Sequence, residues 1–129
     1  MDPRHLKRIE IIQNLFALSF ESLQDNAPYP RDEKTNNIIK QIKKLDSLIR
    51  QYAPKYPLDK IAKTDLAILR LGVYDLLYDK KLPAKVVINE AVELSKELSG
   101  DKSYGFVNAV LGNVYTFLEK KKNEKTRTS

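Results

Sequence analysis

The sequence predicts an all-α protein, a compact single-domain bundle of five main helices plus a short turn. Apolar residues recur at spacings of three and four along the chain, which is the period of an amphipathic helix. No segment alternates apolar and polar residues as a half-buried strand would. A chain of 129 residues is long enough to bury a hydrophobic core as one domain. We assign residues 1–119 to this helical domain and residues 120–129 to a basic tail without an apolar anchor, which we expect to be disordered.

The first helix is expected to begin at Pro3, because proline suits the first helical turn. Its apolar stripe consists of Leu6, Ile9, Ile12, Phe16 and Phe20. Arg4, Lys7 and Arg8 fall near its start, where the helix dipole disfavours cations unless solvent or an anion meets them. A basic cluster is therefore expected at this end of the helix.

The second helix is expected to run through residues 38–52, after a loop at residues 25–34 that contains two prolines. Its apolar residues are Ile38, Ile42, Leu45, Ile49 and Tyr52. Pro54 ends this helix, and a short turn is expected near residues 58–61.

The third helix, residues 64–79, is apolar around nearly its whole circumference, which predicts a central position in the bundle. Thr64 or Asp65 is expected to cap it. The fourth helix follows Pro83 and ends at Gly100, a residue suited to a left-handed C-terminal cap. The fifth helix begins after Ser103.

The composition excludes several classes of site. The chain has no cysteine and a single histidine, His5, so no disulfide, thiolate zinc site, histidine metal cluster or catalytic triad is expected. Its four glycines form no phosphate-binding loop, and its carboxylates alternate with lysines as on solvated helix faces. We therefore expect no enzyme activity, no cofactor and no metal. No apolar run reaches the ~18 residues of a membrane span, so the cytoplasm is the expected location.

A formal charge of +6 and an isoelectric point near 9.4 favour polyanionic partners such as nucleic acids. Besides the basic cluster, Lys102 lies with Tyr104, Gly105 and Phe106 at the start of the last helix. Helix N-termini present free amides to phosphates, and an exposed aromatic ring can stack on an unpaired base. Glycine at this position would let RNA approach closely. The spacing equally allows Phe106 to be the first core residue of its helix.

Three polar residues interrupt apolar helix faces: Arg70, Asn89 and Asn108. Buried polar side chains persist when they satisfy backbone groups or one another. We expect a structural role for all three, with Arg70 paired to Glu90 or Asp75 and the two asparagines bonded to loop carbonyls.

An ordered set of motifs lies within residues 63–115: ILR at 68–70, YDL at 74–76, Pro83, INEAVELSK at 88–96 and FVNAVL at 106–111. With these motifs the segment resembles the NusB family of transcription antitermination factors. The first helix resembles the family's N-terminal helix more loosely, with Gln13, Leu15 and Phe16 at its matching end.

This resemblance implies a small all-helical RNA-binding protein. Family members pair with the ribosomal protein NusE, bind single-stranded boxA RNA, help RNA polymerase to read through terminators in ribosomal RNA operons within the antitermination complex, and support ribosomal RNA processing. The implied RNA-binding residues are Arg4, Lys7, Arg8, Lys102, Ser103 and Phe106. The implied NusE-binding residues are Phe16 and Asp65.

The chain also departs from the family pattern. His5 and Leu6 stand where relatives often carry arginine, and a helix that relatives carry before Ile38 is expected to be absent. One alternative is therefore a protein-interaction scaffold with this fold that has lost strong RNA binding. Another is a weak homodimer that buries its RNA face when idle.

Overall fold

The computed structural model describes residues 2–20, 26–53, 55–100 and 102–128, and the side chains as far as residue 125. Within these ranges it contains helices and no strand, which confirms the all-α class. The elements are α1 (Pro3–Leu18), α2 (Glu33–Lys40), α3 (Ile42–Tyr52), the 3₁₀ helix η2 (Leu58–Lys60), α4 (Lys63–Tyr78), α5 (Ala84–Leu98) and α6 (Tyr104–Thr128).

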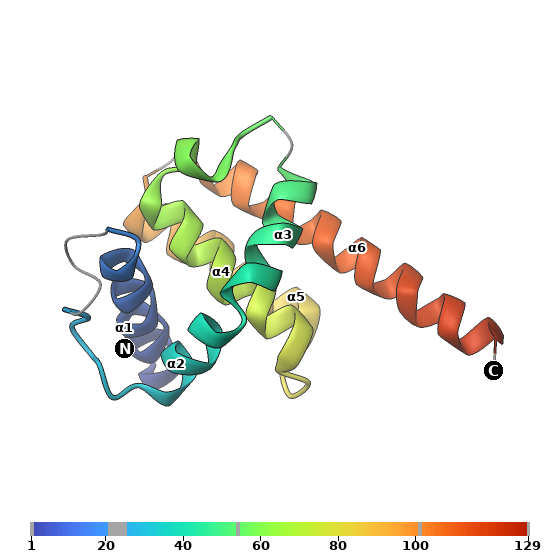
Figure 1. Ribbon diagram of the computed structural model, residues 1–129, viewed down its shortest axis with the longest axis horizontal. Helices are drawn as coiled ribbons and strands as arrows, with labels where there is room; N and C mark the ends of the chain where they lie inside the picture. The colour runs from blue at the N-terminus through green and yellow to red at the C-terminus, as the bar shows by residue number, and fades with distance from the viewer. Residues whose placement is uncertain (1, 21–25, 54, 101, 129) are drawn as a thin grey trace.

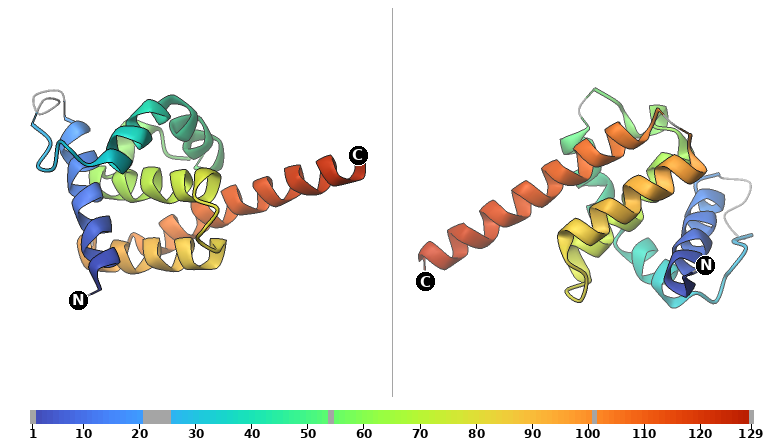
Figure 2. Two further views of the ribbon diagram at one scale, coloured as in Figure 1. Left: turned by 90° about the horizontal axis from the view of Figure 1, so that it is seen from below. Right: turned by 180° about the vertical axis from the view of Figure 1, so that it is seen from behind.

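Helix α4 is the centre of the bundle, as its apolar circumference predicts. It packs against α1, α3, α5 and α6 (Figure 1). Buried α4 residues point in all directions: Leu66, Ala67, Ile68, Leu69, Leu71 and Val73. Figure 2 shows α1 standing across one end of the pair formed by α4 and α5. Residues from α1 and from the starts of α4 and α6 can therefore share a surface.

The prediction of a single second helix, with no helix before it, is wrong. Helix α2 begins at Glu33, three residues after the second proline, because the Asp32 carboxylate accepts hydrogen bonds from the Thr35 N–H (2.8 Å) and hydroxyl (2.6 Å). The chain then turns at Gln41, whose N–H donates to the Ile38 carbonyl three residues back (3.0 Å). The apolar spacing continues through this turn, so periodicity alone does not reveal it.

Two glycines have clear structural roles. Gly72 lies where α4 meets α6, and a Cβ atom there would be 2.9 Å from the Cδ1 of Leu111. Gly100 follows α5 with a φ of +91°, which confirms the predicted left-handed cap. By contrast, the predicted caps of α4 are not used, because α4 starts at Lys63 with Ala62 as its N-cap residue.

The predicted structural roles of the polar residues are only partly correct. Asn89 and Asn108 are exposed, so neither is buried among core residues. Arg70 does form a structural pair, but with Asp46 of α3, to which its Nε and Nη2 donate at 2.9 and 3.0 Å. The buried asparagine is Asn14 of α1, which is 0% exposed.

Helix α6 continues past residue 119 to Thr128 and projects away from the bundle (Figure 1). The side chains at 120–125 are exposed. Disorder of residues 120–129 in solution stays a prediction.

Candidate nucleic-acid interface

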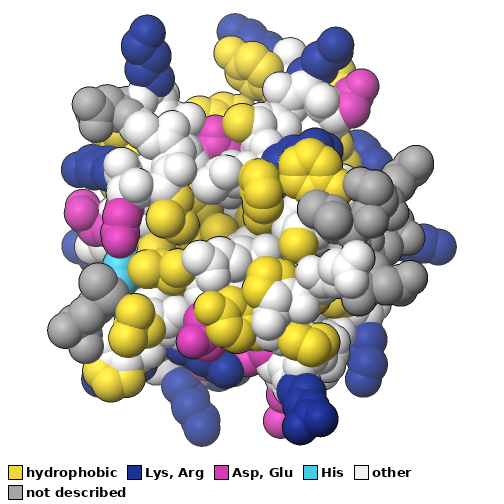
Figure 3. Space-filling model, turned by 90° about the vertical axis from the view of Figure 1, so that its left-hand side faces the viewer, with side chains coloured by type: hydrophobic (Ala, Val, Ile, Leu, Met, Phe, Trp, Pro, Cys, Tyr) yellow, Lys and Arg dark blue, Asp and Glu magenta, His cyan; other side chains and the backbone are white. Residues whose placement is uncertain are grey.

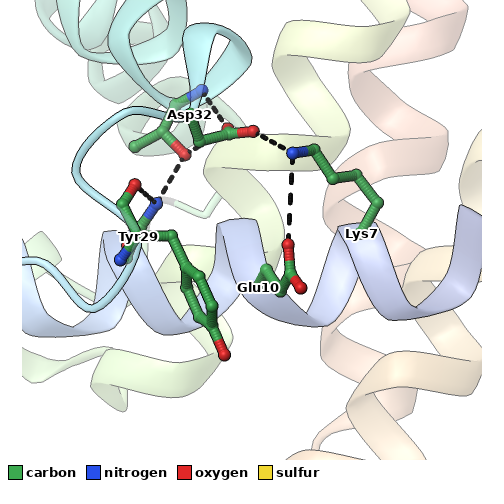
Figure 4. A network of polar contacts seen from close by, with 6 residues as sticks. Lys7, Glu10, Tyr29 and Asp32 are labelled. Carbon is green, nitrogen blue, oxygen red and sulfur yellow. Dashed lines mark hydrogen bonds and ion pairs between the residues drawn. The ribbon is translucent and has the colours of Figure 1, made fainter.

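The basic cluster at the start of α1 is matched by carboxylates from other parts of the chain. The Nζ of Lys7 lies 2.5 Å from a carboxylate oxygen of Asp32 and 4.0 Å from one of Glu10 (Figure 4). Arg8 lies 3.4 Å from Glu90 of α5. These carboxylates offset the unfavourable interaction between the cations and the positive end of the helix dipole.

Arg4 differs from these neighbours because its nearest carboxylate belongs to Asp2, 4.0 Å away, and its side chain is 79% exposed. His5 is held by Glu97, 2.8 Å from its Nε2, and by Glu90, 3.8 Å from its Nδ1. Of the three predicted basic RNA contacts on α1, Arg4 is therefore the one most open to an incoming phosphate.

The Lys7–Asp32 pair belongs to a larger network that ties the segment before α2 to α1. The buried Asn14 amide donates to the Tyr29 carbonyl (2.8 Å) and the Thr35 hydroxyl (2.9 Å), and its oxygen accepts from the Tyr29 N–H (2.7 Å). Burial alone would raise the pKa of Asp32, but hydrogen bonds from Lys7 and Thr35 outweigh burial and lower that pKa. Asp32 is thus held in its charged form beside Lys7.

The predicted residues at the start of α6 do come together. Lys102, Ser103 and Phe106 line one depression of about 220 Å³. The same depression is lined by Tyr56, Lys60 and Asp65. We call these six residues the α4–α6 pocket.

Sequence reasoning missed Tyr56 and Lys60 of this pocket. The ring of Tyr56 is 51% exposed and meets the ring of Phe106 edge-on, with centroids 5.3 Å apart and an interplanar angle of 76°. Phe106 itself is partly buried and packs against the core. The structure therefore supports the interpretation of Phe106 as a core residue, and its role in stacking a base stays a prediction.

Asp65, which the resemblance implies as a NusE-binding residue, is one of the residues that line the α4–α6 pocket. It is 5% exposed, and its Oδ1 is buried with no hydrogen-bond partner. A buried acceptor without a partner is costly, so this atom lowers the stability of the fold.

Phe16 lies elsewhere, in an apolar hollow of about 610 Å³ along α1. The hollow is also lined by Ile12, Gln13, Ala17, Thr64 and Leu98. Figure 3 shows apolar side chains gathered across this face of the molecule. Phe16 is 38% exposed and packs edge-on against Phe20 at 5.1 Å. Thr64 and Asp65 are consecutive, so the first turn of α4 separates this hollow from the α4–α6 pocket.

Among the described residues, no group of three or more His, Asp or Glu side chains is arranged so that it could hold a metal ion, and none of the described helices is long and apolar enough to cross a membrane.

Comparison with known proteins agrees with this architecture. Residues 5–116 match the model of the NusB family. Transcription antitermination protein NusB from Bacillus pumilus is 35% identical over 123 residues, which cover 86% of this chain and 93% of that protein. The protein of the same name from Clostridium perfringens is 37% identical over 116 residues, covering 84% and 86%.

A solved structure titled T. maritima NusB matches with a TM-score of 0.71 and 28% identity, over 89% of this chain and 92% of the other. The fold and these relatives define a small all-helical protein of the transcription antitermination class. The chain belongs to the NusB family.

Proposed function

We propose that this protein is an RNA-binding antitermination factor. It binds single-stranded boxA-like RNA in the cytoplasm as half of a pair with ribosomal protein NusE. The pair joins the RNA polymerase antitermination complex and supports transcription and processing of ribosomal RNA. The observation that carries the proposal is the α4–α6 pocket, where an exposed aromatic ring and two lysines line one depression.

This pocket has the parts that single-stranded RNA requires. Exposed Tyr56 offers a ring face for stacking, and Phe106 supports that ring. Lys60 and Lys102 are exposed at the same depression and supply charge for phosphates. Ser103 lies directly before α6, beside amides that no helical carbonyl satisfies.

We expect the basic cluster on α1 to contribute less to RNA affinity than its number of positive charges suggests. A phosphate that approaches Lys7 or Arg8 competes with Asp32 or Glu90. Arg4 is open and can meet a phosphate directly. We therefore expect the α4–α6 pocket to supply more of the RNA affinity than Lys7 and Arg8 do.

The Phe16 hollow is the proposed surface for NusE. Its apolar lining includes the exposed Phe16 and Leu98 and the buried Ile12 and Ala17. An aromatic ring that packs into a partner is a typical energetic centre of an interface. Phe16→Ala is expected to weaken NusE binding at least tenfold by isothermal titration calorimetry, an effect typical of central aromatic residues. Val86→Ala, an exposed apolar residue of α5, is the control and should leave NusE binding unchanged.

The second candidate is an interaction scaffold that keeps the partner surface but binds RNA weakly. Carboxylate pairing of Lys7 and Arg8 supports it, because those cations are already neutralised. It predicts NusE binding without measurable boxA affinity.

A charge reversal at the pocket separates the two candidates. Lys102→Glu should weaken binding of a boxA-like RNA. It should also make the plot of log binding constant against log salt concentration less steep, by about 0.7 for each phosphate that the variant no longer binds. Lys80→Glu makes the same charge change at the other end of α4, and it should alter both quantities less. Equal effects of the two variants would mean that RNA responds to overall charge alone, and absence of RNA binding by the unaltered chain would favour the scaffold.

A further inference from the structure

We propose that the C-terminal end of α6 is a separate RNA-binding arm, which contacts the phosphates of single-stranded RNA that flanks the boxA-like segment. The arm comprises residues 119–128, and we call it the α6 arm. The proposal rests on the proposed RNA binding. It extends that binding to a part of the chain beyond residue 116, where the match to the family model ends.

The α6 arm carries half of the net positive charge of the chain. Its residues include five lysines or arginines and two glutamates, so the arm supplies three of the six formal net charges. Several cations of the bundle, by contrast, already lie beside carboxylates: Lys7 beside Asp32, Arg8 beside Glu90, Lys34 beside Asp75 and Arg70 beside Asp46. A polyanion is attracted by local net charge, and that charge is concentrated on the arm.

The arm has no part in the hydrophobic core. Among the described residues of α6, the last buried side chain is that of Val114. The side chains at 120–125 are exposed, and the helix leaves the bundle in every view (Figures 1 and 2). The Nζ of Lys121 lies 5.4 Å from the centre of the Phe117 ring, at the point where the helix leaves the bundle. The charges of the arm are therefore presented to solvent, where a polyanion can reach them.

The lysines of the arm suit phosphates. Lys120, Lys121 and Lys122 are consecutive, so they point to different sides of the helix. Lys121 and Lys125 lie one turn apart on the same side, where like charges repel and destabilise a helix. A phosphate between them would remove that repulsion. We therefore expect RNA to bind the arm without base preference and to stabilise its helix.

Helix α6 also sets the distance between the arm and the α4–α6 pocket. At 1.5 Å per residue, about 24 Å of helix separates Tyr104 from Lys120. A stacked strand covers this distance with about seven nucleotides, at ~3.4 Å per nucleotide. An RNA of about six nucleotides held at the pocket is therefore too short to reach the arm, whereas one of about 20 nucleotides is long enough.

The test compares two single-stranded RNAs, a boxA-like core of about six nucleotides and the same core with about eight uridines added at each end. The unaltered chain is compared with two full-length variants. The arm variant replaces four lysines by glutamine, which has a similar helix propensity: Lys120→Gln, Lys121→Gln, Lys122→Gln and Lys125→Gln. The control variant makes the same change of charge at four exposed lysines of the bundle: Lys40→Gln, Lys43→Gln, Lys80→Gln and Lys85→Gln.

The unaltered chain and the control variant should bind the extended RNA about fivefold or more tightly than the core, and the arm variant should bind both RNAs equally. With three phosphates on the arm, the plot of log binding constant against log salt concentration for the extended RNA should be steeper by about 2 in the unaltered chain than in the arm variant. Raising the salt from about 50 to about 200 mM should then cost the unaltered chain about sixteenfold more affinity.

Hydrogen exchange gives a second measurement that needs no variant. The extended RNA should slow amide exchange of residues 120–128 in the unaltered chain, because a bound helix opens less often. The core RNA should leave that exchange unchanged. Thermal melting of each variant checks its fold.

The outcomes distinguish this inference from the proposed function. Equal losses in the arm and control variants would mean that RNA responds to overall charge, and would overturn the arm alone. Equal binding of the two RNAs by the unaltered chain, with both weakened by Lys102→Glu, would also overturn the arm and leave the proposed RNA binding intact. Binding of neither RNA would overturn both. An arm variant that keeps its RNA affinity but loses NusE binding would assign the arm to a protein partner and overturn the inference.

Discussion

The ammonium group of Lys7 lies 2.5 Å from the Asp32 carboxylate and thereby links α1 to the residue that caps α2. Lys7 is half exposed, whereas the Asp32 side chain is 4% exposed. The pair therefore has a structural role within the chain itself. A lysine chosen from sequence as an RNA contact is, in the folded chain, one half of an ion pair.

Replacing Asp32 by asparagine isolates the charge of this pair, because an asparagine oxygen can still cap α2. The folded-state pKa of Asp32 is lowered, so its charge contributes stability above the unfolded-state pKa and loses that contribution as pH falls through the folded-state pKa. Urea unfolding should find Asp32→Asn less stable at neutral pH, with the difference vanishing in acid. A difference that stays constant down to acid pH would mean that the carboxylate charge is not its source.

The Asn14 network should be among the most sensitive polar features of the fold. Asn14→Ala removes three hydrogen bonds at a fully buried position and should cost about 2–3 kcal/mol in the free energy of unfolding. Asn108→Ala is the matched control on an exposed helix face and should change stability by less than about 0.5 kcal/mol. Equal losses would mean that the exposed asparagine has the structural role first expected of it.

Two of the glycines, Gly72 and Gly105, allow a second comparison of matched variants. Gly72→Ala forces a methyl group against Leu111, which is 0% exposed, and should destabilise the protein by about 1–3 kcal/mol. Gly105→Ala meets open space within α6 and should stabilise it by up to about 1 kcal/mol. Thermal melts of the two variants should therefore shift in opposite directions.

Gly105→Ala also tests the idea that this glycine lets RNA approach. The variant should fold at least as well as the unaltered chain, so weaker RNA binding would mean that the added methyl group hinders the RNA. Unchanged RNA binding would show that the glycine is not needed there.

The end of α6 should contribute little to folding. Its side chains from 120 to 125 are exposed, and the helix projects beyond the bundle. Truncation after residue 119 should leave the melting temperature within about 2 °C, since surface changes alter stability only slightly. In the full chain, the amides of residues 120–128 should exchange faster than those of residues 107–118. Slow exchange there would contradict the predicted disorder.

Local chemistry made much of the fold predictable. The apolar circumference of α4 and the glycine after α5 depend on neighbouring residues alone, and both predictions are confirmed. The turn at Gln41 was missed because the apolar spacing continues across it. The predicted partner of Arg70 was wrong because its actual partner, Asp46, belongs to another helix, and only tertiary packing brings the two together.

The candidate site, like the fold, could be predicted only where its residues are close in sequence. Lys102, Ser103 and Phe106 are close in sequence, and the structure places them in one pocket. Tyr56 was missed because it stands in a proline-flanked connection with no helical pattern to orient it. The pairing of Lys7 and Arg8 was missed because Asp32 and Glu90 are distant along the chain. Charge counts from sequence cannot show which cations are already compensated.

The first turn of α4 separates the Phe16 hollow from the α4–α6 pocket. Thr64 faces the Phe16 hollow and Asp65 faces the α4–α6 pocket, and both are held by a helix buried at the centre of the bundle. Molecules that occupy the two hollows would be close neighbours without sharing a residue. Each hollow is already formed without a molecule in the other, so either molecule could bind first.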